Sequence, residues 1–346
     1  MEFLNKKNII PSLFAAICTI AGCTQNTSSI TAERSSLSFE ITAATTDIIA
    51  PQELVITISN GLGFNRERSI PNPSNTGSVQ FPEVPYGHLF VDVQGMSNGF
   101  RTMFGHSEAE ISAPKFNTGV VLRNNLSTKT IGPVKEQLFL QSAFWDDTYG
   151  DNRTVQCWTA SSSTTLLTTV VASQQYLYFL FQVQDHTFTG EDRPVNQNGE
   201  MTADAVIVYL CKSPPYELNA NGGVFPAVRF QCEVGKDIVD NCEFNFVNFQ
   251  NSAVRNFTMA ALNNDEVKGR MVRSDAQCTL ELRINKGLLE LPTDNTNNRQ
   301  LFGLVIRYRD SIDPFQPVQL FDWQSGQVES DPKTQLTSWG YLDIAP

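Results

Sequence analysis

The chain has 346 residues, 41% of them hydrophobic and 18% charged, and it carries a formal net charge of -11 at pH 7. Proteins that bind nucleic acid neutralise phosphates with clustered Lys and Arg, and this acidic sequence contains no such cluster. We therefore expect no nucleic acid among its partners.

The first residues follow the plan of an export signal. Lys6 and Lys7 form a short basic region, a mostly apolar run covers 9–20, and small residues then lead into Cys23. The apolar run is too short to span a bilayer as a stable helix. Residues 1–22 are therefore predicted to be a signal peptide, which makes the mature protein a secreted one. An ordinary cleaved signal followed by an incidental Cys is the alternative.

The four residues Ile20 to Cys23, "IAGC", resemble a bacterial lipobox. The resemblance implies that Cys23 becomes the first mature residue and holds the protein to the lipid bilayer through an N-terminal acyl anchor. Several acyl chains on one residue anchor a protein far more strongly than one chain does. Thr24 follows the Cys, and in this family the lack of Asp there implies the outer membrane of a bacterial cell envelope. The small polar residues 23–34 are predicted to be a tether.

Residues 35–124 alternate between apolar and polar types in short segments such as "SLSFEITA" and "HLFVDVQG", which Pro, Gly or Asn separate. A period of two indicates half-buried strands. The stretch "NTGSVQFPEVPYGHLFVDVQG" resembles one hairpin of the immunoglobulin-like or transthyretin-like modules. We therefore predict a small N-terminal β-sandwich, followed by a polar linker over 125–135, where the alternation fades.

The remaining residues, 136–346, contain strand-like segments in a fixed order. Trp145 precedes a polar turn, "QYLYFLFQVQD" is a long apolar strand ending at Asp185, Asp204 opens the strand "AVIVYL", and "WGYL" begins at Trp339. The order and spacing of these segments resemble the family 9 carbohydrate-binding module and its DOMON-like relatives. The resemblance implies a larger C-terminal β-sandwich, so the predicted fold is all-β with two sandwich domains.

Loops at the rim of a β-sandwich commonly bind ligands, and Asp185 and His186 lie where a strand exits into such a loop. The resemblance implies a glycan or polysaccharide as the ligand, although the chain has Met201 or Thr202 where the family often has a Trp. The alternative is that Asp185 only accepts hydrogen bonds from its own turn. The predicted ligand-binding residues are Asp185, His186, Arg193, Asp204, Arg309 and Trp323.

Catalytic chemistry has little support in the sequence. No H-E-x-x-H motif occurs and the chain has only three His, so we expect a protein that is not an enzyme. The loop after Asp185 does contain oxygen-bearing side chains of the kind that calcium prefers. The same composition is also typical of a solvated loop. The candidate calcium ligands are Asp192, Asn196, Asn198 and Glu200.

The cysteines beyond Cys23 do not form a metal-binding motif. There are five of them, none in a C-x-x-C pair, and an odd number leaves at least one unpaired in a monomer. An oxidising compartment permits disulfides. Cys232 and Cys242 are the favoured pair, because their segment is typical of two short strands joined by a turn. The alternative is that all five are buried thiols.

These patterns leave three functions open. The first is a membrane-anchored lipoprotein that binds carbohydrate non-catalytically through its C-terminal sandwich. The second is a structural or docking lipoprotein, which has envelope protein partners and no sugar site. The third is a DOMON-like protein that binds haem non-covalently, with His186 and a Met such as Met201 as axial ligands.

Overall fold

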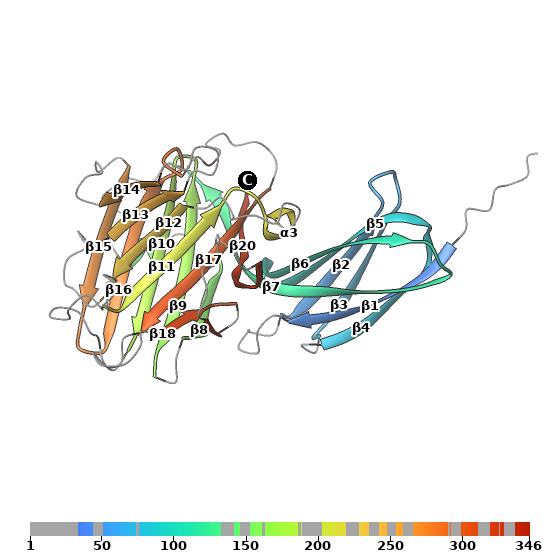
Figure 1. The fold of residues 1–346 in the computed structure, drawn as a ribbon, viewed down its shortest axis with the longest axis horizontal. Coiled ribbons are helices and arrows are strands. Elements are labelled where there is room, and N and C mark those ends of the chain that lie inside the picture. The colour runs from blue at the N-terminus through green and yellow to red at the C-terminus, as the bar shows by residue number, and fades with distance from the viewer. Residues whose placement is uncertain are drawn as a thin grey trace, which may run out of the picture.

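The structure is a computed structural model, and most of its described residues lie in strands, so the predicted all-β fold is confirmed. Figure 1 shows two β-sandwiches side by side. The described residues are 34–43, 51–73, 76–132, 142–145, 153–160, 163–185, 188, 203–218, 228–234, 242–247, 254–258, 266–289, 291, 299–310, 319–324, 326–328 and 336–346.

The first sandwich is built from alternating strands, as the sequence predicts. One sheet pairs β1 with β4 and β7, and the other has the order β3-β2-β5-β6-β7. In β1, the alternating residues Leu37, Phe39 and Ile41 are buried in the core between the sheets. The strands are β1 (Arg34–Ala43), β2 (Glu53–Ser59), β3 (Asn65–Pro71), β4 (Thr76–Pro85), β5 (Gly87–Ser97), β6 (Phe100–Ile111) and β7 (Lys115–Ile131).

The second sandwich encloses a larger core. One sheet has the order β8-β9-β10-β16-β15. The other runs β14-β13-β12-β11-β17, and both β18 and β20 pair with β17. The elements are α2 (Ser142–Trp145), β8 (Val155–Thr159), β9 (Thr165–Ser173), β10 (Tyr176–Gln184), β11 (Ala205–Cys211), α3 (Pro215–Leu218), β12 (Val228–Glu233), β13 (Cys242–Val247), β14 (Val254–Thr258), β15 (Val267–Arg273), β16 (Gln277–Asn285), β17 (Gln300–Asp310), β18 (Gln319–Asp322), β19 (Gly326–Val328), the 3-10 helix η6 (Leu336–Ser338) and β20 (Gly340–Ala345).

Strand β10 is central in its sheet and is covered on both faces. Phe179 and Phe181 point into the core between the two sheets, whereas Tyr178 packs with Phe144 and Trp145 on the opposite face. A strand that is apolar at nearly every position therefore lies where both of its faces exclude water.

Strand β7 belongs to both sandwiches. Its first part pairs with β1 and β6, and from Asn125 onward it pairs in parallel with β20 and then with β9. The strand thus continues to Ile131, through the first part of the predicted linker at 125–135. The polar residues there are buried because they have partners: Asn125 Nδ2 donates to the Arg101 carbonyl at 2.9 Å, and the Ser127 amide donates to Thr154 Oγ1 at 2.7 Å. The predicted domain limits themselves stay a prediction.

Cys232 is disulfide-bonded, whereas Cys157 and Cys211 are free thiols. The register of β12 and β13 sets Cys232 opposite Cys242, the residue with which it is predicted to pair. Within the described ranges, no helix has the length and apolar character needed to cross a membrane.

Candidate functional site

The structure brings together two of the predicted ligand-binding residues, Asp185 and Asp204, beside Tyr308. Asp185 is 2% exposed, and its Oδ2 accepts a hydrogen bond from the Tyr308 hydroxyl at 2.8 Å. The pKa of Tyr308 is well above its ordinary value, because burial disfavours the phenolate and the nearby charges of Asp204 and Asp185 disfavour it further. We call Tyr308, Asp185, Asp204 and the adjacent Asp310 the Tyr308 cluster.

Arg309 and Trp323, which are also predicted to bind the ligand, do not lie in the Tyr308 cluster. Successive strand residues point to opposite faces, so Arg309 points away from Tyr308, and its Nε donates to the Ala203 carbonyl at 2.7 Å. Trp323 is 2% exposed, and its carbonyl accepts a hydrogen bond from Asn124 Nδ2 on β7 at 2.6 Å. A ring that is so deeply buried presents no face to a sugar in this conformation. The predicted ligand role of these residues stays untested.

Several other predicted positions lie outside the described residues. They are the lipidation residue Cys23, the rim residues His186 and Arg193, the haem candidate Met201, and the calcium candidates Asp192, Asn196, Asn198 and Glu200. In the part of the chain that the structure does describe, no group of three or more His, Cys, Asp or Glu is placed to hold a metal ion.

Residues 95–99, "GMSNG", match the G-x-S-x-G pattern of hydrolase nucleophile elbows. An elbow holds its Ser between a strand and a helix. Here Ser97 ends β5, and Asn98 and Gly99, both with positive φ, lead directly into β6. Asn-Gly with positive φ at both positions is the preferred two-residue turn of a β-hairpin. The motif therefore forms a hairpin turn in this fold.

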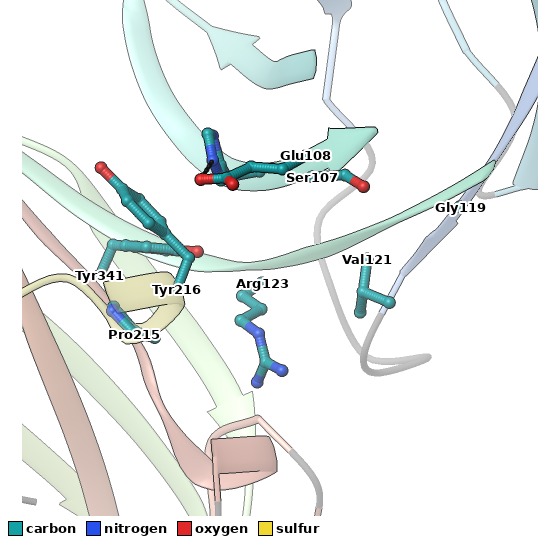
Figure 2. A pocket seen from close by; sticks show the side chains of 9 residues that line it. Ser107, Glu108, Gly119, Val121, Arg123, Pro215, Tyr216 and Tyr341 are labelled. Atoms are coloured by element: carbon teal, nitrogen blue, oxygen red, sulfur yellow. Dashed lines mark ion pairs between the residues drawn. The ribbon is translucent and has the colours of Figure 1, made fainter. Parts of the chain in front are cut away.

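An open pocket of about 290 Å³ lies where the two sandwiches meet (Figure 2). Strands β6 and β7 of the first sandwich form one side, and α3 and β20 of the second form the other. We call it the junction pocket. Its lining residues are His106, Ser107, Glu108, Gly119, Val121, Arg123, Pro215, Tyr216 and Tyr341.

Local sequence explains how these side chains reach the pocket. In β6 the alternation places His106 and Glu108 on the same outer face of the sheet. On the opposite side, Pro214 and Pro215 start the short helix α3, where Pro is well tolerated because the first helical amides need no partner within the helix. This turn holds Tyr216 half-buried over the His106 ring, with centroids 4.3 Å apart.

His106 joins the rings of the pocket to two carboxylates. Its Nδ1 lies 2.6 Å from Asp92 Oδ1, and its Nε2 lies 3.6 Å from Glu108 Oε1. Burial alone would lower the pKa of His106, but the hydrogen bond to Asp92 and the charges of Asp92 and Glu108 outweigh burial and raise it. The imidazolium form is therefore more favoured than in a free His side chain, and the ring is held between two acids.

Arg123 connects the pocket to the second sandwich. Its Nη1 donates to the Thr337 carbonyl and to the Trp339 carbonyl, each at 3.1 Å. Behind it, Tyr341 is 2% exposed and packs edge-on against Phe104 at 5.1 Å. The guanidinium therefore provides a planar polar group in the pocket, and the buried rings behind it support the wall.

A buried ion pair fixes the two sandwiches together below this pocket. Asp343 on β20 is fully buried, and its carboxylate lies 3.4 Å from Arg101 Nη1 on β6 and 2.6 Å from Arg299 Nε. Ser127 on β7 donates to the same carboxylate at 3.3 Å. The first two partners of Asp343 come from different sandwiches, so the contact holds the walls of the pocket in one arrangement.

The junction pocket is not evident from the sequence. One local signal is present: His106, Glu108 and Glu110 alternate, which places three titratable side chains on one strand face. Tyr216 and Tyr341 lie more than one hundred residues further along the chain and give no local sign that they face β6.

The chain matches no protein-family model and no curated protein. Among solved structures it is similar to a family 9 carbohydrate-binding module from Caldicellulosiruptor kristjanssonii in complex with cellotriose, with 11% identity over 64% of this chain and 94% of that one, at a TM-score of 0.38. The chain is also similar to a family 9 module from the same organism in complex with glucose. The identity is 12% over 64% of this chain and 95% of that one, and the TM-score is 0.37.

A protein from Bacteroides uniformis, described as a proposed carbohydrate-binding protein, is similar at 11% identity over 63% of this chain and 98% of that one, with a TM-score of 0.41. Since all three TM-scores lie below 0.5, these likenesses do not identify a shared ligand or a shared site.

Proposed function

We propose that this protein is a lipid-anchored protein of the cell envelope that binds carbohydrate without transforming it, and that the sugar binds in the junction pocket. The observation that supports the proposal is the pocket itself, in which the half-buried ring of Tyr216 lies beside Glu108 and Arg123. Sugars present apolar C–H faces and many hydroxyl groups, so they bind where aromatic rings and polar side chains meet.

The size of the pocket limits what it holds. At about 290 Å³ it is at the small end of ligand pockets, which span roughly 300–1,000 Å³. Such a volume suits one sugar unit rather than a folded oligosaccharide. Glu108 accepts hydrogen bonds from hydroxyl groups, and the Tyr341 hydroxyl stays neutral because burial raises its pKa.

The test is binding of the soluble form, starting after Cys23, to an array of glycans, followed by calorimetry on the glycans that bind. Tyr216→Ala should weaken binding about tenfold or more, since each factor of ten corresponds to about 1.4 kcal/mol. Tyr176→Ala is the matched control, because Tyr176 is also half-buried but packs on the far side of the second sandwich. A protein that binds no glycan, or in which both variants bind like wild type, contradicts the proposal.

The anchor has its own test, motivated by the "IAGC" segment. Cys23→Ala should prevent lipidation and release the protein from membranes. If the variant still fractionates with membranes after a carbonate wash, Cys23 is not the anchor. Neither result decides whether the protein binds sugar.

The docking alternative is favoured by one observation. Trp323, the predicted sugar-binding aromatic residue of the second sandwich, is buried in its core. If the glycan array stays blank while the protein co-purifies with a defined envelope protein after cross-linking in intact cells, the docking function replaces sugar binding.

A further inference from the structure

A row of aromatic rings leads away from the junction pocket across the outer face of the first sandwich. The Tyr216 ring contacts His106 at 4.3 Å, His106 lies 6.1 Å from Phe90, and Phe90 lies 4.8 Å from His88 between centroids. We call these four residues the ring row. Three of them come from adjacent strands, since β5 and β6 pair Asp92 with His106 and Phe90 with Glu108.

The row changes from enclosed to open along its length. The side chain of His106, next to the pocket, is 12% exposed, whereas that of His88 at the far end is 47% exposed. Phe90 between them is half-buried. A ligand bound at the pocket end therefore has a continuous path over aromatic groups toward solvent.

Carboxylates lie along this row. Glu108 Oε2 is 3.3 Å from His88 Nε2, and Glu110 Oε2 is 3.5 Å from His88 Nδ1. Asp92 is bonded to His106 as described above. Each ring of the row on β5 and β6 is thus next to a group that accepts hydrogen bonds, and carboxylates form the stronger, charge-assisted kind of hydrogen bond.

We propose that the ring row extends the junction pocket, so that the protein binds a chain of several neutral sugars with one unit in the pocket and further units along His106, Phe90 and His88. This inference rests on the proposed function and adds the substrate class to it. The repeated pairing of a ring with a carboxylate fits a polymer whose units each present a C–H face and hydroxyl groups.

The charge of this face selects against acidic polymers. Asp92, Glu108 and Glu110 all lie on it and outnumber the two His side chains beside them, and the whole chain carries a net charge of -11. Like charges across an interface disfavour binding. A glycan rich in uronic acid or sulfate would bring anions against these carboxylates, so a neutral glycan is the expected ligand.

The experiment compares chain lengths. Wild-type protein and variants are titrated calorimetrically with neutral gluco-, manno- and xylo-oligosaccharides, from a single sugar to chains of several units, and with oligogalacturonate as the anionic comparison. We expect the affinity of wild type to rise with length for one neutral series. We expect Phe90→Ala to reduce the ratio of long-chain to single-sugar affinity about tenfold.

Phe116→Ala is the matched control, because Phe116 is a half-buried Phe of the same sandwich that packs against its core. It should leave the length dependence unchanged. Thermal melts of both variants show whether either fails to fold. Should Phe90→Ala unfold, Phe90→Leu takes its place, since it keeps apolar volume and removes the ring.

The outcomes separate this inference from the proposed function. Binding of single sugars with no gain for longer chains overturns the ring row and leaves the pocket standing. An unchanged length dependence in the Phe90 variants, or tighter binding of oligogalacturonate than of any neutral chain, also overturns it. If no oligosaccharide of any length binds, the proposed function fails and the inference fails with it.

Discussion

The Tyr308 cluster and the junction pocket use similar residues in opposite ways. Both set a tyrosine among carboxylates. In the Tyr308 cluster the hydroxyl donates to Asp185 at 2.8 Å, and Asp185 and Asp204 are buried. In the junction pocket, Tyr216 is half-buried and Glu108 is exposed.

The difference shows what burial does to a carboxylate beside a tyrosine. A buried carboxylate loses its hydration and needs an internal donor, so it becomes part of what holds the fold together. An exposed carboxylate beside a ring remains available to a ligand. The residue types are the same in both regions, although Tyr308 lies on β17 and Tyr216 on α3, and solvent access distinguishes structural residues from ligand-binding ones.

The largest expected effect comes from the ion pair that fixes the two sandwiches together. Asp343→Ala removes a fully buried carboxylate and leaves Arg101 without its charged partner. Breaking a buried pair from one side costs about 3–5 kcal/mol. Urea unfolding should show a loss of this size in the free energy of unfolding.

Arg34→Ala is the control for this prediction, since the ion pair of Arg34 with Glu83 is exposed and such pairs contribute only about 0–1 kcal/mol. If Asp343→Ala costs no more than this control, the junction is not held by its buried charges. The pocket would then lack the fixed walls on which sugar binding depends.

A smaller effect is expected at the Tyr308 cluster. Tyr308→Phe removes the donor of Asp185 and should lower the free energy of unfolding by about 1–3 kcal/mol. Glycan affinity should stay at the wild-type value, because the cluster is closed to solvent. Tyr216→Ala should show the reverse, with weaker binding as its main effect. Weaker binding with an unchanged melt in Tyr308→Phe would instead support the rim site predicted from the sequence.

The strands could be predicted because their signals are local. The segment "SLSFEITA" alternates, and β1 accordingly buries Leu37, Phe39 and Ile41. The segment "YLYFLFQVQ" is apolar nearly throughout, and β10 is buried on both faces. In each case a few neighbouring residues contain the whole pattern. Successive side chains of a strand point to opposite faces, so the pattern determines which side chains are buried.

The junction could not be predicted in this way. The polar run around Asn125 and Ser127 is typical of a linker, yet these residues are buried because side chains and carbonyls distant in the sequence satisfy them. The pocket needs β6, α3 and β20 at one place, and their meeting depends on the parallel pairing of β7 with β20. Pairing between strands more than two hundred residues apart has no local signature.

The smallest expected effect is the pH dependence of stability that His106 gives to the junction pocket. The pKa of His106 is raised in the folded protein, because Asp92 and Glu108 outweigh the effect of burial. A group whose folded pKa lies above its unfolded value, about 6.5 for His, binds its proton more tightly when folded. Its contribution to stability is fully present below the unfolded pKa and is lost as the pH rises through the folded pKa.

We therefore compare wild type with His106→Asn by thermal melting at about pH 5.5 and about pH 8.5, on either side of the His range. The gap in melting temperature should be largest at the lower pH and should shrink at the higher one. Asp322, whose burial raises its pKa to about 6, titrates in both proteins and cancels in the difference. Asp92→Asn should reduce the same pH dependence, because it removes the main partner of the imidazolium. A gap that does not change with pH would show that His106 stabilises this region through packing rather than through its charge.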